Sequence, residues 1–343
     1  METAINQDLK ALIFSGAVSA EYVGSYFVAL GSRLLPLITK SGATVQSINT
    51  EQFEDLEIPV PPRDVQDEIV KRLLAAFKSK HEKENRARQL FASVDGILSD
   101  ELGMQTSAQE RTIQGRIFTT SFRDVTGDRF DPEIVLFRRQ THKSKYPSRR
   151  FCTLFTQQPQ YGSGARGLNR KSLEQARYIR ITDIDEYGNL SDELGATSAG
   201  LEDRYSLQDD DLLIARSGNT VGKAYLHKTA LQPYQCFYAG YLIRFRLDAS
   251  IVSPDYVFAI TQSSYYKAWV RATQRAAGQP NINAREYSNL QIPLPSLPVQ
   301  NRIVSRIRVA RDDARELRRK AIAEFEESKK SIQALILGPM GAA

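Results

Sequence analysis

Small and apolar residues recur at steps of three and four near the end of the chain. They are Ile303, Ile307, Ala310, Ala314, Leu317, Ala321, Ser328, Ile332 and Leu335. An earlier stretch has matching spacing, interrupted by Lys80 and Lys83, at Ile69, Leu73, Ala76, Ala87, Leu90, Val94 and Ile97. Heptad spacing is typical of long helices that pack along each other. The pattern predicts a helix pair with a seam that contains Ile69, Leu73, Leu90, Ile303, Ile307, Leu317 and Ile332.

The two predicted helices belong to two copies of one sequence pattern. Residues 18–23 match 252–257, residues 48–49 match 282–283, residues 58–61 match 292–295, and residues 65–66 match 299–300. Every pair is separated by the same 234 positions, without a gap over more than fifty residues. A constant offset of this length indicates an internal duplication. In both copies a proline-bounded extended segment, 56–61 or 290–295, precedes the long helix.

The residues between the copies predict a mixed α/β domain. Strand-like runs occur at 178–182, 211–216 and 241–245. In the last two runs, Arg216 and Arg244 are expected on the face opposite the isoleucines. A helix is predicted from Pro254 to about Thr273. The fold class is therefore α+β, with a mixed domain flanked by two long helices.

Composition narrows the class of protein. A chain of 343 residues allows two or three domains. No run approaches the roughly 18 uninterrupted apolar residues that a membrane span needs. Cys152 and Cys236 are too few for a disulfide framework and do not form a C-x-x-C pair, and three histidines offer little for a zinc site. We expect a cytoplasmic protein without a metal site or a membrane segment.

The distribution of charge is more informative than the net charge of +6. Residues 138–180 contain eleven lysines and arginines and one acid, whereas residues 181–212 contain ten acids and one arginine. A second acid-free basic stretch holds Lys267, Arg271, Arg275 and Arg285. Two positive segments in one domain favour a polyanion surface. Solvated surface charge without a partner is the alternative.

Catalytic motifs are incomplete throughout the chain. Residues 162–167 match G-x-G-x-x-G, but they follow a polar, loop-like stretch instead of a buried strand. Residues 217–223 resemble a phosphate loop without the hydroxyl residue that should follow Lys223. Neither the Pro-Asp and Glu-x-Lys spacing of a nuclease nor an amino-methyltransferase motif is present. The glycine-rich segment is therefore interpreted as a basic loop that approaches a polyanion.

Three sets of residues resemble the specificity (S) subunit of type I restriction–modification systems. They are residues 178–184 with 211–223, residues 279–283 with 290–295 and 300–304, and the heptad helix that ends near Gly338. The resemblance covers residues from about 115 to 338. Residues from about 18 to 103 share only the C-terminal features of that pattern. It implies two target-recognition domains held apart by an antiparallel coiled-coil pair, each reading half of a bipartite double-stranded DNA site. It also implies no cofactor and no catalytic residue, because methyltransferase (M) and restriction/translocase (R) subunits supply the chemistry.

The predicted organisation departs from that of the family in its first half. Residues 1–61 are interpreted as the C-terminal remnant of a first recognition domain, 62–103 as the first helix, 104–295 as a complete recognition domain, and 296–338 as the second helix. The offset places the counterpart of about 115–234 before residue 1, so the glycine loop and both motif strands occur once. A second copy or a separate N-terminal S-subunit fragment is expected to supply the other half-site. The alternative is a coiled-coil scaffold with impaired DNA reading.

Candidate DNA contacts divide by chemistry. Cations are expected to hold phosphates, which position the duplex without reading it. They are Arg166, Arg170, Lys171, Lys223, Lys267, Arg271 and Arg275. Polar side chains that match base edges are expected to read sequence, since arginine suits guanine and asparagine or glutamine suits adenine. These candidates are Tyr161, Ser163, Arg180, Arg216, Gln279 and Asn281.

Overall fold

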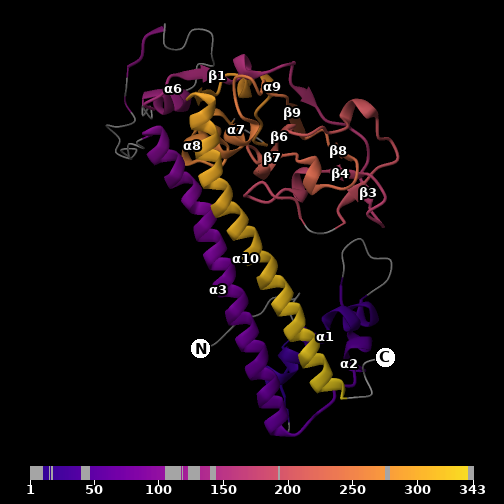
Figure 1. Ribbon diagram of the computed structural model, residues 1–343. Helices are drawn as coiled ribbons and strands as arrows, with labels where there is room; N and C mark the ends of the chain where they lie inside the picture. Colours follow the sequence, from indigo (N-terminus) through magenta and orange to yellow (C-terminus); the bar gives the residue numbers. More distant parts are fainter. Residues whose placement is uncertain are drawn as a thin grey trace. The chain divides into compact units, whose positions relative to one another are not determined.

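Two compact units make up the chain in a computed structural model, each with its own core. The structure describes residues 11–14, 16, 18–39, 47–104, 117, 119–122, 132–139, 144–191, 194–274 and 279–338. The first unit combines Met1–Gln89 with Asp313–Ala343, and the second is Leu90–Asp312. Two long helices, α3 (Arg63–Leu102) and α10 (Leu297–Leu337), contribute residues to both units (Figure 1). None of the described helices is long and apolar enough to span a bilayer.

The first unit is helical. It contains α1 (Ala20–Ile38), the short α2 (Thr50–Glu54), the start of α3 and the end of α10. The Ser19 hydroxyl caps α1 by accepting a hydrogen bond from the Tyr22 amide. The core takes apolar side chains from all three long segments: Tyr22, Val23, Tyr26, Ala29, Leu30, Leu34, Ile69, Leu73, Phe325, Ile332 and Ile336.

The two long helices are antiparallel. In the first unit, Ile69 and Leu73 near the start of α3 share a core with Ile332 and Ile336 near the end of α10. In the second unit, Glu101 at the end of α3 pairs with Arg306 near the start of α10. Hydrogen bonds from Arg306 and Arg302 lower the pKa of the Glu101 carboxyl. The predicted antiparallel pair is confirmed.

The predicted seam needs two corrections. Ile69, Leu73, Ile303, Ile307 and Ile332 are buried, as the heptad spacing predicts. Leu90 and Leu317 are only half-buried. In the second half of α3, Ala87 and Val94 are buried as predicted, but Phe91 and Leu98 are buried in place of Leu90 and Ile97, one residue later. An α-helix of 3.6 residues per turn drifts against a seven-residue repeat, and the Phe91 ring stacks on Tyr187 with centroids 4.0 Å apart.

The second unit is built on short strands. Four of them form an antiparallel sheet in the order β2-β9-β6-β7: β2 (Gln160–Tyr161), β9 (Leu242–Phe245), β6 (Leu212–Ala215) and β7 (Ala224–Leu226). Three separate pairs complete it: β1 (Ser148–Arg150) with β10 (Gln291–Pro293), β3 (Leu168–Asn169) with β5 (Ala196–Thr197), and β4 (Arg177–Ile179) with β8 (Cys236–Tyr238). The β4–β8 pair is parallel and the other two are antiparallel. The remaining helices are α6 (Pro132–Arg139), α7 (Pro254–Ile260), α8 (Ser264–Thr273) and α9 (Ala284–Tyr287).

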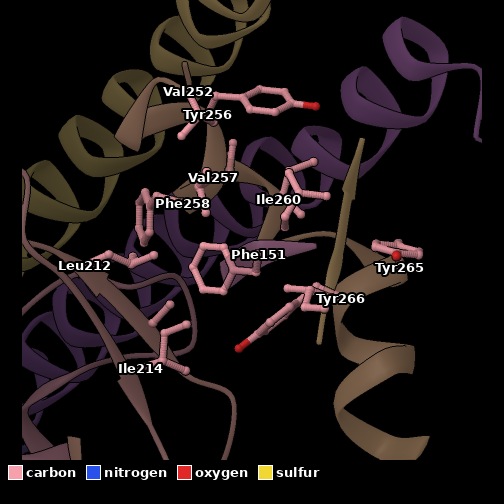
Figure 2. Packing of buried hydrophobic residues seen from close by; sticks show 14 of the residues in the cluster. Phe151, Leu212, Ile214, Val252, Tyr256, Val257, Phe258, Ile260, Tyr265 and Tyr266 are labelled. Atoms are coloured by element: carbon pink, nitrogen blue, oxygen red, sulfur yellow. The ribbon is translucent and has the colours of Figure 1, made fainter. Parts of the chain in front are cut away.

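The core of the second unit lies between the sheet and helices α7 and α8. Phe151 is fully buried among Leu212 and Ile214 of the sheet, Ile260 of α7 and Tyr266 of α8 (Figure 2). The helix predicted over 254–273 is two helices. The Ser263 hydroxyl interrupts it, because its oxygen donates to the Ile260 carbonyl at 2.6 Å and accepts from the Tyr266 amide at 3.2 Å.

One predicted strand is shorter than expected, and the two predicted extended segments differ in their pairing. Residues 178–182 yield only β4, because the Arg180 amide donates to the Asp183 carboxylate at 2.8 Å and the chain turns into a short 3₁₀ segment, Ile181–Asp183. The predicted extended segment 290–295 contains β10, whereas its equivalent, 56–61, pairs with no described strand. The other predicted strands are confirmed as β6 and β9.

The duplication is visible in equivalent hydrogen bonds. In the first copy, Gln66 accepts from the Ser19 amide at 3.1 Å and donates to the Pro61 carbonyl at 2.9 Å. In the second copy, Gln300 accepts from the Ser253 amide at 2.8 Å and donates to the Pro295 carbonyl at 2.9 Å. A tyrosine hydroxyl donates to a proline carbonyl in each copy, Tyr22 to Pro59 and Tyr256 to Pro293. Each of these positions repeats at the 234-residue offset, so the sequence repeat is a structural repeat.

Candidate nucleic-acid interface

Two tyrosines and an arginine gather where the strands of the sheet end. Tyr161 is the last residue of β2, Tyr241 precedes β9, and Arg216 follows β6. These strands are neighbours, and the Arg216 amide donates to the Tyr241 carbonyl at 2.9 Å. The Arg216 guanidinium carbon lies 5.1 Å from the centroid of the Tyr161 ring and 6.0 Å from that of Tyr241. Such distances allow cation–π attraction, which holds the cation beside two exposed rings.

The segment that contains Gln279 and Asn281 lies against Arg216. Ser217 and Asn281 form an antiparallel bridge, and the Ile282 amide donates to the Arg216 carbonyl at 2.9 Å. Gly218 has a φ of +70°, and a Cβ there would lie 3.2 Å from the Gln279 amide nitrogen. A glycine is therefore favoured at this close approach. We call the side chains of Tyr161, Arg216, Tyr241, Gln279 and Asn281 the Arg216 cluster.

Polar groups continue beside the Arg216 cluster into an open hollow. The hollow is lined by Gln158, Pro159, Tyr161, Asn283, Ala284, Arg285 and Ser288. The Tyr161 hydroxyl accepts a hydrogen bond from the Ala284 amide at 3.1 Å, which ties the ring to the start of α9. Asn283 and Glu286 cap that helix reciprocally. This hollow and the Arg216 cluster therefore present donors and acceptors on one surface.

Arg216 carries charge that is not neutralised nearby. Among the described residues it forms no ion pair, and its buried Nε has no hydrogen-bond partner. A buried donor without a partner costs free energy. The guanidinium therefore keeps its charge for an anionic or acceptor-rich ligand at this edge.

Several predicted phosphate contacts are accessible. Arg166 and Lys171 are exposed in the glycine-rich loop, and Lys267 and Arg271 are exposed one turn apart on α8. Within the described ranges, none of these four pairs with a carboxylate. Lys223 is half-buried, and its ammonium donates to the Ile184 carbonyl at 3.2 Å. The predicted contact at Arg275 lies outside the described residues.

The predicted phosphate contact at Arg170 is wrong. Its side chain is 4% exposed. The guanidinium donates to the carbonyls of Leu173 and Gln175, each at 2.8 Å, and of Leu194 at 3.3 Å. It also lies 3.8 Å from the centroid of the Tyr234 ring. Arg170 therefore holds the loop together and does not reach a ligand.

The predicted base contact at Ser163 is also wrong. Ser163 is 4% exposed, and its hydroxyl accepts from the Ala165 amide at 3.1 Å. Gly162 beside it packs so closely that a Cβ would lie 2.2 Å from the Ala239 carbonyl oxygen. The first glycine of the dinucleotide-like motif is therefore required by packing between neighbouring segments.

Arg180 lies apart from the contacts of the Arg216 cluster. Its guanidinium pairs with Asp183, with Nη2 2.9 Å from Oδ1, and this hydrogen bond raises the pKa of Arg180. The side chain is nevertheless 44% exposed. The candidate DNA contacts chosen from the sequence omit Tyr241, which lies in the Arg216 cluster, and Arg285, which lines the hollow. Tyr241 could have been found from its position at the start of the predicted strand 241–245, next to the end of the predicted strand that carries Arg216.

Comparisons with known proteins identify the family. The family described as "Type I restriction modification DNA specificity domain" matches residues 2–89 and 168–327, which is more than half of the chain. The chain belongs to this family, and the resemblance seen in its sequence is confirmed. The first matched segment ends in the second half of α3, and the second ends in the equivalent long helix.

Individual relatives are distant. The chain is 24% identical over 300 residues to the type I restriction enzyme EcoKI specificity subunit of Escherichia coli (strain K12), covering 86% of this chain and 58% of that protein. It is 26% identical over 109 residues to the StySPI specificity subunit of Salmonella potsdam, covering 31% of this chain and 23% of that protein. The solved S subunit of a type I system from M. genitalium has 11% identity and a TM-score of 0.49, covering 93% of this chain and 73% of that one. The chain thus spans less than two thirds of either curated relative.

Proposed function

We propose that the chain is a non-catalytic DNA-recognition subunit of a type I restriction–modification complex. It would direct methyltransferase and restriction/translocase subunits to a double-stranded target. Membership of the specificity family and the Arg216 cluster support this proposal. The observation that carries it is Arg216, a half-buried cation held by two exposed tyrosines beside amide side chains, with no carboxylate partner among the described residues.

The proposed contacts follow from exposure and chemistry. Arg216, Gln279 and Asn281 would read base edges, because their donors and acceptors match those in the major groove. Tyr161 and Arg180 remain secondary candidates for base contacts. Exposed cations of the same unit would hold phosphates. They are Arg166, Lys171, Lys267 and Arg271, with Lys223 at a half-buried position.

One half of a bipartite site would be specified by this recognition domain. The other half would come from a second copy of the chain or from a separate N-terminal S-subunit fragment. The internal repeat supports this division, since among the described residues the strands of the sheet accompany only the second copy.

The test is Arg216→Ala in the complex reconstituted with its methyltransferase subunits. Duplexes selected from a random library by the unaltered complex define its site. Losing a bidentate base contact should weaken binding to that site by about 1–3 kcal/mol and relax preference at one base pair. Arg204→Ala is the matched control, because Arg204 is exposed and already paired with Glu202 in the acidic segment.

A second variant distinguishes the contacts that read bases from the contacts that hold phosphates. Reversing Arg166 and Lys171 to glutamate should weaken binding to all duplexes alike and reduce the salt dependence, because each phosphate contact releases counterions. Unchanged sequence preference in Arg216→Ala, or a sequence-specific loss in the double reversal, would contradict the assigned roles.

A further inference from the structure

Helix α8 is held at its start by a carboxylate from α3. Ser263 caps the helix locally, since its hydroxyl accepts from the Tyr266 amide at 3.2 Å. The next amide, that of Ser264, donates to Asp95 Oδ1 at 2.8 Å. The first amides of a helix have no partner within it, and a carboxylate there also lies at the positive end of the helix dipole. Asp95 is therefore a second cap for α8, supplied from 169 positions away.

The packing of α3 fixes the position of the Asp95 carboxylate. Two nearby residues of the helix, Val94 and Leu98, are each 1% exposed and belong to the core of the second unit. Asp95 itself is half-buried, and it forms no ion pair within the described part of the chain. Because a helix anchored in the core presents this carboxylate, Asp95 determines where α8 begins relative to α3.

The buried face of α8 packs against residues 217–223, the loop that follows Arg216. The Tyr266 hydroxyl donates to the Gly222 carbonyl at 2.9 Å. Gly222 has a φ of +86°, and a Cβ there would lie 2.8 Å from the Val270 side chain. A glycine is therefore required where the loop meets the helix. The position of α8 thus limits the position of the loop.

Two hydrogen bonds connect this packing to Ala215, the residue before Arg216. The Gly222 amide donates to the Ala215 carbonyl at 2.9 Å, and the Tyr287 hydroxyl donates to the same carbonyl at 2.8 Å. The Tyr287 ring lies against Trp269 of α8, with centroids 5.7 Å apart. A shift of α8 would therefore move both donors to the Ala215 carbonyl, next to the Arg216 cluster.

We propose that Asp95 is a positioning residue for the Arg216 cluster. By fixing the start of α8, it holds the loop of residues 217–223 and orients Arg216. The inference rests on the proposed function, since it takes Arg216 as a group that reads bases. The exposed face of α8 presents Lys267 and Arg271. One carboxylate on α3 therefore sets the position of both the proposed base contact and two proposed phosphate contacts.

Trp269 reports the placement of α8 without DNA, because it is the one tryptophan of the chain. It is 8% exposed in α8. In the full chain with Asp95→Ala, its fluorescence emission should shift to longer wavelength as water reaches the ring. The Gly222 amide should exchange its hydrogen about tenfold faster, because the loss of a helix cap makes local opening easier. Asp95→Asn keeps an acceptor oxygen and should restore both values.

A second variant removes the donor and leaves Asp95 in place. Ser264 is the first residue of α8, where proline is favoured and its missing N–H does not disturb the helix. Ser264→Pro should therefore reproduce both changes of Asp95→Ala in a protein that keeps α8. Asp100→Ala is the matched control, because Asp100 is an exposed aspartate of the same helix. It should change neither the emission nor the exchange.

The complex reconstituted with its methyltransferase subunits tests the effect on reading. With duplexes selected by the unaltered complex, Asp95→Ala should relax preference at the base pair that Arg216→Ala relaxes. The expected relaxation is about threefold or more, and the combined variant should relax it no further than Arg216→Ala alone, because both changes act on one contact. Equal weakening for all duplexes, with that preference intact, would make Asp95 a cap that only stabilises α8 and would overturn the inference.

The measurements without DNA separate this inference from the proposed function. Unchanged Trp269 emission and Gly222 exchange in both Asp95→Ala and Ser264→Pro would overturn the positioning role, as would equal changes in Asp100→Ala. Unchanged sequence preference in Arg216→Ala would contradict the proposed function. In that case the fluorescence and exchange measurements still decide whether Asp95 holds the loop that follows Arg216.

Discussion

The two copies of the repeat have the same local bonds and different surroundings. Gln66 and Gln300 are both buried, and each links the residue before a helix to a proline carbonyl. The extended segment that each tyrosine contacts differs, since Ile292 is fully buried in the β1–β10 pair and Ile58 is half-buried. Each copy therefore forms the same glutamine and tyrosine hydrogen bonds, whether or not a second strand pairs with its extended segment. Strand pairing in the second copy adds burial, so an equivalent side chain contributes more stability there.

The largest losses of stability are expected at equivalent positions that are buried in both copies. Ile69 and Ile303 are equivalent and both 0% exposed. Ile69→Asp and Ile303→Asp should each lower the free energy of unfolding by about 3 kcal/mol or more, because a carboxylate is buried without a partner. Chemical denaturation followed by circular dichroism measures this loss. Leu74→Asp is the control on α3, because Leu74 is 63% exposed. A small loss at either isoleucine would contradict the seam.

A loss of stability of intermediate size should differ between the two copies. Ile292→Ala removes a fully buried side chain and should cost about 3 kcal/mol, whereas Ile58→Ala should cost about 1 kcal/mol because water already reaches that site. The same denaturation experiment measures both. Equal costs would show that the first copy is covered as fully as the second.

The smallest expected difference concerns the tyrosine anchors. Tyr256→Phe and Tyr22→Phe each remove a hydroxyl that donates to a proline carbonyl, at 2.7 Å and 2.6 Å. Pro293 is buried, so its carbonyl would lose its partner, and we expect a cost of about 1–2 kcal/mol. Pro59 is exposed, so water can replace the hydroxyl, and the cost should be about 0.5 kcal/mol. A larger loss for Tyr22→Phe would reverse this interpretation.

The sequence predicted the features that depend on local pattern. The constant offset located both copies, and proline-bounded segments marked the starts of α3 and α10 within a residue or two. Strands β6 and β9 followed from their apolar runs. The register in the middle of α3 could not be predicted, because the packing of Phe91 depends on Tyr187, a residue almost a hundred positions away.

The candidate site was predicted only in part, because its geometry also depends on residues that are distant in sequence. Arg166 and Arg170 lie in one basic loop and are indistinguishable by composition. Their difference arises from carbonyls at Leu173, Gln175 and Leu194, which surround Arg170 alone. The approach of Arg216 to Tyr161 and Tyr241 depends on the order of the strands in the sheet. Residue type therefore identified candidates, and tertiary contacts decided which of them are accessible.

The discontinuous make-up of the first unit has a consequence for how the protein is made. Its core joins Tyr22 and Leu30 to Ile332 and Ile336, which are separated by about 300 positions of sequence. The second unit is one continuous stretch, Leu90–Asp312. Because a ribosome releases the chain from its N-terminus, the second unit can close while the first still lacks part of its core. The residues of the first unit that precede Leu90 are thus among the last to reach their native packing, and until then their apolar side chains are available to chaperones.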